Sequence, residues 1–301
     1  MPNPREGTMN EGIRQKVEGI RDFLPPIPLV MNELVQLLSR EDVDMRSLAD
    51  VISKDPSMTM NVLRIANSAF YALPNKVSTL DHAVTMLGIK ELTSLCMSCG
   101  AAAALAPAKG QKTIDLHSFW RHSVATGVIA RILAVEFGLP TTNLYLGGLM
   151  HDIGMIVLDR FFHPLYSRIV ELTFKENMPV IEAETRVLGE THAKIGGWLM
   201  EKWKLPPLFC EIASFHHSVE ESSEEHRMVV CLVSLANQVS RLTGFGFGGD
   251  ETGIVISDSA AFRFIAKTHP RINDMDIAKF VMDLDRTDNE ISELERMITN
   301  E

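Results

Sequence analysis

The sequence predicts an all-α protein built from two packed helical lobes. Apolar residues recur at helical spacing through almost the whole chain, whereas alternating strand-like runs and hairpin turns are scarce. With 301 residues and 46% hydrophobic content, the chain can bury a substantial core. We therefore expect a globular helical fold, and we find no repeat of fixed period that would indicate a solenoid.

The charge of the chain and its N-terminal sequence narrow the class of protein. The formal net charge of -10 disfavours attraction to nucleic acid and to anionic lipid surfaces, because these partners are also negative. Residues 1–30 carry charges throughout and lack the central apolar run of a secretory signal. No apolar run reaches the length of about eighteen residues that a membrane helix needs. We expect a cytoplasmic protein that binds neither nucleic acid nor membranes.

The first lobe is predicted to span residues 24–105, after an N-terminal arm at residues 1–23. Prolines at the start of the lobe fix the backbone and prepare the entry of the chain, so no helix is expected there. Three helices follow, at residues 29–39, 44–53 and 57–66. The second of these ends before Asp55, because the following Pro56 disfavours helical backbone in the residue that precedes it.

The end of the first lobe contains a fourth predicted helix and a pair of cysteines. Ser78 or Thr79 can cap this helix, and Gly88 interrupts it. Cys96 and Cys99 form a CxxC within an apolar stretch, which favours buried helical thiols over a redox pair. The chain has only four cysteines, too few for a disulfide-stapled secreted fold of this length.

The segment DPSMTMNVLRIAN in the first lobe can also be interpreted as a helix-turn-helix. Acidic residues outnumber basic residues between positions 24 and 105. The basic footprint expected of a duplex-binding surface is therefore absent, and this alternative is disfavoured.

The rest of the chain is predicted to form a second helical lobe and a tail. The connector is assigned to residues 106–112, the second lobe to residues 113–243 and the helical tail to residues 244–301. The glycine-rich segment at residues 244–250 is expected to be a flexible break. The last helix carries three apolar residues on one face: Ile291, Leu294 and Ile298. That face can dock on the body of the protein or on a partner.

Five helical segments of the second lobe place a ligand-type side chain where helical spacing predicts a core-facing residue. These side chains are His122, His151 with Asp152, His192, His216 with His217, and Asn237. Burying five imidazoles without strong partners would cost on the order of several kcal/mol, and a divalent cation can supply the missing partner. Imidazole and carboxylate ligands suit iron, manganese, nickel or zinc, so we expect one or two divalent transition-metal ions.

Glycines lie close in sequence to the His-Asp pair. The remaining histidines do not share the pattern of a ligand-type side chain on an apolar helical face. Gly147 and Gly148 share a helical face with His151 and allow close backbone approach, and Gly154 can end that helix. The other histidines are expected to be surface or structural residues: His82, His117, His163, His226 and His269.

The His-Asp pair in GGLMHDIG, the earlier FWRHS and the later THAKIG and FHH resemble the HD superfamily of metal-dependent phosphohydrolases. Within it, the chain from residue 24 to about residue 242 resembles the HDOD domain, with first-lobe signatures in ISKDPSMTMNVLRIANSAFYALP and LDHAVTMLGIKEL. The resemblance implies a bacterial signalling or regulatory module, generally without demonstrated enzymatic activity. It also implies a protein partner in a signalling pathway and leaves a homodimer open.

Similarity to the binuclear HD-GYP phosphodiesterases implies a role for each ligand. Asp152 would bridge two metals, with His122 and His151 on one side and His192, His216 and His217 on the other. Asn237 stands where the HD pattern usually has an aspartate, and Met155 stands where a lysine commonly follows HDIG. The segment SVEESSEE replaces the GYP segment. These differences favour a noncatalytic module over the alternative, a metal-dependent phosphohydrolase that uses a metal-bound water.

Overall fold

The computed structural model describes residue 19 and residues 24–38, 44–105, 113–247 and 255–299. Within these residues the regular structure consists of α-helices and short 3-10 turns, without strands. The predicted all-α class is therefore confirmed. The predicted connector, most of the N-terminal arm and part of the predicted flexible break lie outside the described residues.

The first lobe contains the predicted helices, with small shifts at their ends. They are α2 (Leu29–Leu38), α3 (Met45–Ser53), α4 (Pro56–Ala66) and α5 (Leu80–Ala104). Three of them are capped by a side chain that accepts a first-turn backbone N–H: Asp44, Asp55 and Thr79. Thr79 is thus the cap of α5. Helix α4 begins at proline, earlier than predicted, because the fixed φ of proline suits a first helical turn.

Helix α5 is interrupted at Gly88 and then continues into the core. Gly88 has φ 81° and ψ 162°, a conformation that glycine tolerates best. The helix resumes after it and buries Cys96 and Cys99, which are free thiols. Burial raises the pKa of Cys99 to about 12 and the pKa of Cys96 well above its usual range. Both are therefore unreactive buried thiols, as predicted.

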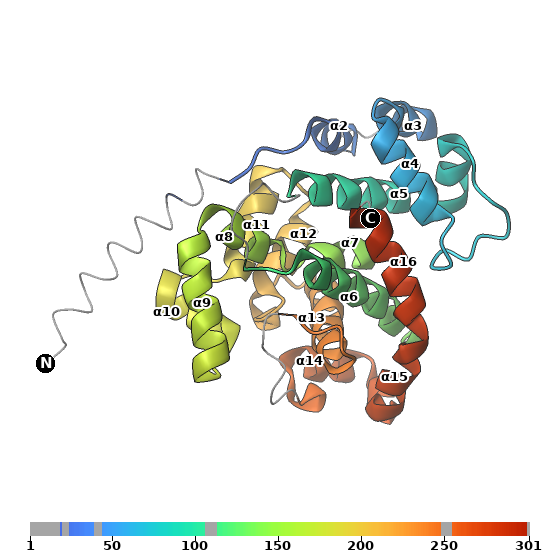
Figure 1. Cartoon of the computed structure of the whole chain (residues 1–301). Helices are drawn as coiled ribbons and strands as arrows, with labels where there is room; N and C mark the ends of the chain where they lie inside the picture. Colours follow the sequence, from blue (N-terminus) through green and yellow to red (C-terminus); the bar gives the residue numbers. More distant parts are fainter. Residues whose placement is uncertain (1–18, 20–23, 39–43, 106–112, 248–254, 300–301) are drawn as a thin grey trace, which may run out of the picture.

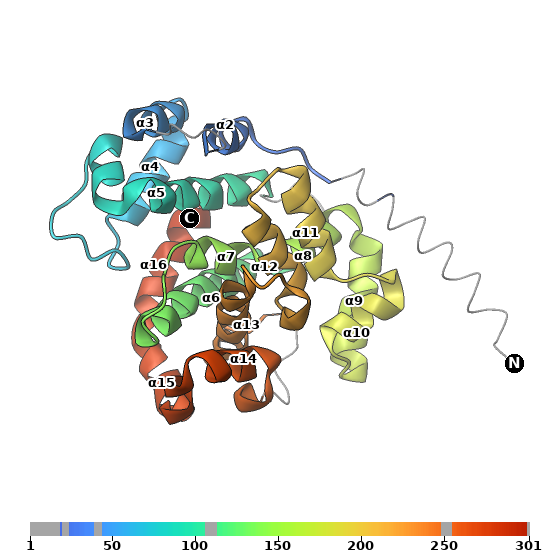
Figure 2. The same cartoon turned by 180° about the vertical axis from the view of Figure 1, so that it is seen from behind.

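The second lobe is a bundle built around α6 and α13. Its helices are α6 (Leu116–Glu136), α7 (Leu144–Met150), α8 (Ile153–Phe161), α9 (His163–Glu176), α10 (Val180–Leu188), α11 (His192–Lys202), α12 (Pro207–Phe215) and α13 (Arg227–Leu242). Figure 1 shows α6, α7 and α13 near the centre and the α9–α10 pair at one side. Helices α11 and α12 lie on the face seen in Figure 2. Helix α6 packs on α7 and α13, while α11 packs on α8 and α12.

Side chains of both lobes meet where α5 contacts α7. Phe70 of the first lobe packs on Tyr145 of the second, with 5.1 Å between ring centroids. The guanidinium group of Arg131 lies over Phe70, 4.3 Å from its ring centroid. Farther along, the indole nitrogen of Trp203 donates to the carbonyl of Pro25 at 2.9 Å. These contacts hold the two lobes against each other.

The C-terminal tail crosses from the second lobe to the first. Helices α14 (Ala260–Thr268) and α15 (Ile277–Asp283) lead into α16 (Asp288–Thr299), which packs on α6 and also contacts α4 and α5 (Figure 1). Its predicted apolar face is buried: Ile291, Leu294 and Ile298. The imidazole of His117 lies 2.7 Å from the buried carboxylate of Glu295, and Arg121 pairs with Asp288. The apolar face therefore docks on the body of the protein, one of the two predicted alternatives.

Glycines let two pairs of helices touch through their backbones. A Cβ on Gly148 of α7 would overlap with the Cα and N atoms of Gly127 on α6. A Cβ on Gly154 would overlap with the carbonyl oxygen of His192. The prediction that Gly154 ends a helix is wrong, because the helix ends at Met150 and Gly154 lies inside α8. Its function is to let α11 approach α8. These contacts draw together the helices that carry the predicted ligands.

We expect Gly148→Ala to lower the free energy of unfolding by about 1–3 kcal/mol, because the added methyl group meets backbone atoms that cannot rotate away. Gly147→Ala is a matched control on the same helix, since its methyl group would lie 2.8 Å from Cδ1 of Ile212, the mobile end of a side chain. Urea unfolding measures both variants. Equal losses of unfolding free energy in the two variants would show that the backbone contact between α6 and α7 makes no particular contribution to stability.

Candidate metal centre

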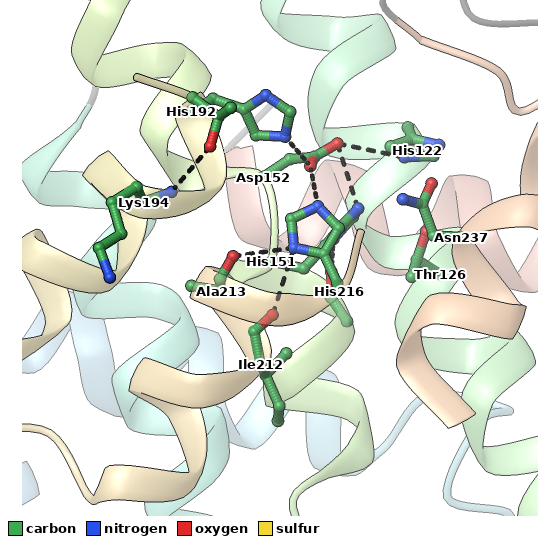
Figure 3. Close-up of polar contacts among 12 residues, drawn as sticks. His122, Thr126, His151, Asp152, His192, Lys194, Ile212, Ala213, His216 and Asn237 are labelled. Carbon is green, nitrogen blue, oxygen red and sulfur yellow. Dashed lines mark hydrogen bonds and ion pairs between the residues drawn. The ribbon is translucent and has the colours of Figure 1, made fainter. Parts of the chain in front are cut away.

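Helices from across the second lobe bring the predicted ligands to one place (Figure 3). His122 lies within α6, the His151–Asp152 pair joins α7 to α8, His192 begins α11, His216 caps the end of α12, and Asn237 lies within α13. All of these side chains are buried, with exposed fractions between 0% and 3%. His217 is the exception, since it is exposed.

The carboxylate of Asp152 lies at the centre of the group. Its Oδ2 atom is 3.1 Å from Nε2 of His151 and 3.5 Å from Nε2 of His122. Its Oδ1 atom is 3.1 Å from Nε2 of His192 and 3.2 Å from Nε2 of His216. Each carboxylate oxygen therefore faces two imidazole nitrogens.

The second ring nitrogen of three histidines is held by a backbone carbonyl. Nδ1 of His151 and Nδ1 of His216 each donate to the carbonyl of the residue three positions earlier, at 2.6 and 2.9 Å. Nδ1 of His122 donates to the carbonyl of Phe245 at 2.8 Å. A proton on Nδ1 leaves the lone pair on Nε2, which is directed toward Asp152 and is available to a cation.

His192 is held by a buried carboxylate from the neighbouring helix. Its Nδ1 lies 2.9 and 2.8 Å from the two carboxylate oxygens of Glu184, which also accepts the backbone N–H of His192 at 2.9 Å. Burial alone would lower the pKa of His192, but the charge of Glu184, its hydrogen bond to Nδ1 and the nearby charge of Asp152 raise it to about 10. A carboxylate on Nδ1 makes Nε2 a stronger donor to a metal.

Glu184 is a residue of the candidate centre that the sequence prediction missed. Its spacing of four residues from Val180 and from Leu188 was an available signal, because all three share the buried face of α10. An acidic residue at a core-facing helical position needs a partner, which here is His192.

The buried atoms around Asp152 have the chemistry of a cation site. Within the described part of the chain, Nε2 of His122, His151, His192 and His216 and both oxygens of Asp152 lack a hydrogen-bond partner. Buried electron-pair donors that face one another are costly unless a cation or a proton lies between them. The residues present therefore fit a bound metal ion.

The protonation of these groups also suits coordination. Burial lowers the pKa of His151 and lowers the pKa of His216 to about 4, so both rings are neutral near pH 7 and can act as ligands. Burial would raise the pKa of Asp152, but the charge of His151 and the close nitrogens of the surrounding imidazoles hold it well below its usual range. The carboxylate is therefore ionised, and it faces the neutral rings of His151 and His216.

The donors divide into two groups that share Asp152. We call Asp152, His192, His216 and His217 the His192 half, and His122, His151 and Asp152 the His122 half. Within each group the ligand atoms lie within 4.8 Å of one another. This is the division that the resemblance to binuclear enzymes implied.

Asn237 lies next to the His122 half, and its amide already has a partner. The hydroxyl of Ser240 lies 3.1 Å from Nδ1 of His122 and donates to the backbone carbonyl of Asn237 at 2.8 Å. The side-chain oxygen of Asn237 accepts a hydrogen bond from Nε of Arg241 at 3.1 Å. Coordination of a metal by Asn237 stays a prediction. Its pairing with Arg241, four positions later on α13, could have been anticipated from helical spacing.

Met155 and the remaining histidines lie outside this group. Met155 is fully buried in the apolar core, so this position supplies no cation to the centre. None of the other histidines belongs to the buried class, and three of them pair with acidic residues: His117 with Glu295, His163 with Asp159, and His226 with Glu211. They are surface or structural residues, as predicted.

Several known proteins are similar to this chain. The HDOD domain family model matches residues 24–219. An uncharacterized protein from Treponema pallidum is 26% identical over 223 residues, which are 73% of this chain. The chain spans 42% of the length of that curated relative.

Solved structures share the fold. An HDOD domain protein of unknown function from Geobacter sulfurreducens is 25% identical, with a TM-score of 0.78 over 95% of this chain and 96% of that chain. A candidate phosphohydrolase from Shewanella amazonensis is 22% identical, with a TM-score of 0.70 over 95% and 97% of the two chains. A candidate signal transduction protein from Marinobacter aquaeolei is 22% identical, with a TM-score of 0.72 over 96% of this chain and 66% of that chain.

Replacement of Glu184 by glutamine should weaken metal binding about 10- to 100-fold, the usual effect of losing a carboxylate that orients a histidine ligand. Glu182→Gln is the matched control, because Glu182 is an exposed carboxylate on the same helix. Isothermal titration with manganese or zinc measures the affinity of each variant. Equal affinities would contradict a role for Glu184 in the centre.

The two halves should also differ in metal occupancy. The His192 half offers three imidazoles and Asp152, whereas the His122 half offers two imidazoles and the same carboxylate. Anomalous scattering from crystals grown with limiting metal should therefore show the higher occupancy beside His192. Asn237→Asp should raise occupancy in the His122 half, because a carboxylate adds negative charge beside the cation. Equal occupancy in the parent protein would refute this ranking.

Proposed function

Since the chain belongs to the HDOD domain family, we propose that it is a signalling module that binds one or two divalent transition-metal ions in its second lobe without hydrolysing a substrate. The observation that carries the metal-binding part is the set of buried imidazole and carboxylate atoms without hydrogen-bond partners around Asp152. Iron, manganese, nickel and zinc all suit these ligand types.

The enclosure of the centre supports a structural or sensory role for the metal. Catalytic metal sites keep a coordination position open to substrate, whereas structural sites are closed by protein. Here four imidazoles and Asp152 are buried, and His217 alone among the candidate ligands is exposed. Met155 brings no positive charge that could neutralise a substrate phosphate, a contribution that active sites commonly require.

A metal-dependent phosphohydrolase is the second candidate function. The His122 half has three protein donors, which is the number typical of catalytic zinc sites. A bound metal would lower the pKa of a water molecule and so supply a nucleophile near neutral pH. Asp152, His122 and His151 would hold the ion.

The proposed output is contact with a protein partner of a signalling pathway in the cytoplasm. The net charge of -10 argues against nucleic acid as the partner. No helix among the described residues combines the length and apolar character that crossing a bilayer requires. Self-association as a homodimer is a further form of this proposal, and light scattering of the purified chain over a range of concentrations tests it.

Asp152→Ala should remove most of the bound metal, because Asp152 is the one carboxylate that both halves share. Elemental analysis of protein purified without chelator, with and without added manganese, measures this loss. Asp159→Asn is the matched control: Asp159 is a buried carboxylate on α8 that accepts backbone N–H groups of Thr113 and Ile114. Metal content near zero in the parent protein would refute the proposal.

A hydrolysis assay separates the two candidate functions. We expect a generic phosphodiester with manganese to be hydrolysed no faster by the parent protein than by Asp152→Ala, since the enclosed centre lacks a substrate-binding cation. Manganese-dependent hydrolysis that disappears in Asp152→Ala would favour the phosphohydrolase.

A further inference from the structure

A pocket lies where the first lobe meets the C-terminal helix. Its walls come from α4, from the loop at residues 67–79 that joins α4 to α5, and from α16, which contacts α4. Its volume is about 790 Å³, within the range of about 300–1,000 Å³ that is usual for small-molecule sites. The candidate metal ligands do not line it. The pocket is therefore a separate place at which a ligand can bind.

The loop that forms one wall of the pocket is held in place by Asn67. The amide nitrogen of Asn67 donates to the carbonyls of Leu63 and Val77, each at 2.7 Å, and its amide oxygen accepts the backbone N–H of Val77 at 2.7 Å. Within this loop, Ala72 has φ 44°, a left-handed conformation that is costly for a residue with a Cβ. Asn67 thus clamps the two ends of the loop, and a wall that is already formed lowers the free-energy cost of binding.

Part of the lining is apolar and contains two methionines. Leu63 and Leu73 line the pocket together with Met60 of α4 and Met297 of α16. Met60 is 61% exposed, although burial of its side chain would be favourable. Methionine is flexible and polarizable, so it adapts to apolar groups of different shapes and makes favourable contacts with aromatic rings. This lining favours a ligand with an apolar body.

The charged side chains of the lining favour a negative ligand. Arg64 and Lys76 are exposed, and in the described part of the chain neither side chain has an ion-pair or hydrogen-bond partner. Among the described residues that line the pocket, Glu293 is the only acidic one. Two cations and one carboxylate leave a surplus of one positive charge, in a chain whose net charge is -10. An anion is therefore attracted to this pocket more than to the surface of the chain as a whole.

We propose that this pocket binds a small organic anion with an apolar body. The apolar body lies against the leucines and methionines, and the anionic group lies against Arg64 and Lys76. The loop that forms the wall also carries Phe70, which packs on Tyr145 of the second lobe. The ligand thus contacts the segment that joins the two lobes, as an input to a signalling module must. This inference goes beyond the proposed function and does not depend on metal binding.

Fluorescence titration of the purified full-length chain with anilinonaphthalene sulfonate, an aromatic anion, tests the proposal. We expect saturable binding of one probe per chain. Phenylnaphthylamine has the same aromatic body without the sulfonate, and it should bind about two- to fivefold more weakly, the equivalent of an exposed charge pair. Added salt should weaken binding of the sulfonate alone, because salt screens exposed charges. Absence of saturable sulfonate binding, or equal affinity for the two probes, would overturn the proposal.

Charge variants test which groups attract the anion. Arg64→Gln and Lys76→Gln should each weaken sulfonate binding about two- to fivefold and leave binding of the neutral probe unchanged. Glu293→Gln should strengthen sulfonate binding, because it removes a repulsive charge from the lining. Lys90→Gln is the control, since Lys90 is an exposed lysine of α5 that does not line the pocket. Sulfonate affinity that is unchanged in both Arg64→Gln and Lys76→Gln would contradict the proposal.

A pair of size variants tests where the probes bind. Ala69 lines the pocket and is exposed, so Ala69→Phe fills part of the pocket without disturbing the core. It should weaken binding of both probes. Ala103→Phe, at an exposed position of α5 outside the pocket, should change neither affinity. Circular dichroism checks that both variants are folded. Parent-like affinity for both probes in folded Ala69→Phe would place the probes elsewhere and refute the pocket.

Elemental analysis of the same samples separates this inference from the proposed function. We expect each of these variants to contain as much metal as the parent protein. A parent protein without metal that still binds the sulfonate in this pocket would refute the metal centre and support the pocket. A metal-loaded parent protein that does not bind the sulfonate would refute the pocket alone.

Discussion

One buried carboxylate, Asp152, determines the arrangement of the second lobe. Its two oxygens meet imidazoles from separate helices in a region that water does not reach. An aspartate side chain is short, so every helix that contributes a ring must come close to the junction of α7 and α8. Glycines make this approach possible where α6 meets α7 and where α8 meets α11. The convergence of these helices on Asp152 therefore has two consequences: their backbones pack closely, and the buried imidazoles and carboxylate need a cation as a partner.

Much of this arrangement could be predicted because buried polar residues interrupt an otherwise regular apolar pattern. Histidines on apolar helical faces predicted which side chains the structure brings together around Asp152, and apolar periodicity predicted the helices. Glu184 was missed because its carboxylate meets His192 only after α10 and α11 pack. Gly154 was misinterpreted because local sequence cannot separate a glycine that ends a helix from one that a neighbouring helix crosses. Both residues were misjudged because their roles depend on contacts between helices, which the local sequence does not show.

The departure at Asn237 shows how one substitution can change the chemistry of a site while preserving its shape. An amide and a carboxylate have nearly the same size, so either group can occupy position 237 on α13. Their hydrogen-bonding properties differ, since the amide donates and the ionised carboxylate only accepts. Arg241 selects which end of the amide faces the centre.

The hydrogen bond between His122 and Phe245 connects the centre to the rest of the chain. The carbonyl that fixes the tautomer of His122 belongs to the peptide through which the chain leaves α13. The ring of Phe245 also lies beneath Arg121, 5.2 Å from its guanidinium group, and Arg121 pairs with Asp288 at the start of α16. The chain cannot take a different path at Phe245 without losing this hydrogen bond. Thermodynamic linkage would then work in both directions: a metal ion in the His122 half would stabilise one path of the chain at Phe245, and any contact that holds that path would strengthen metal binding.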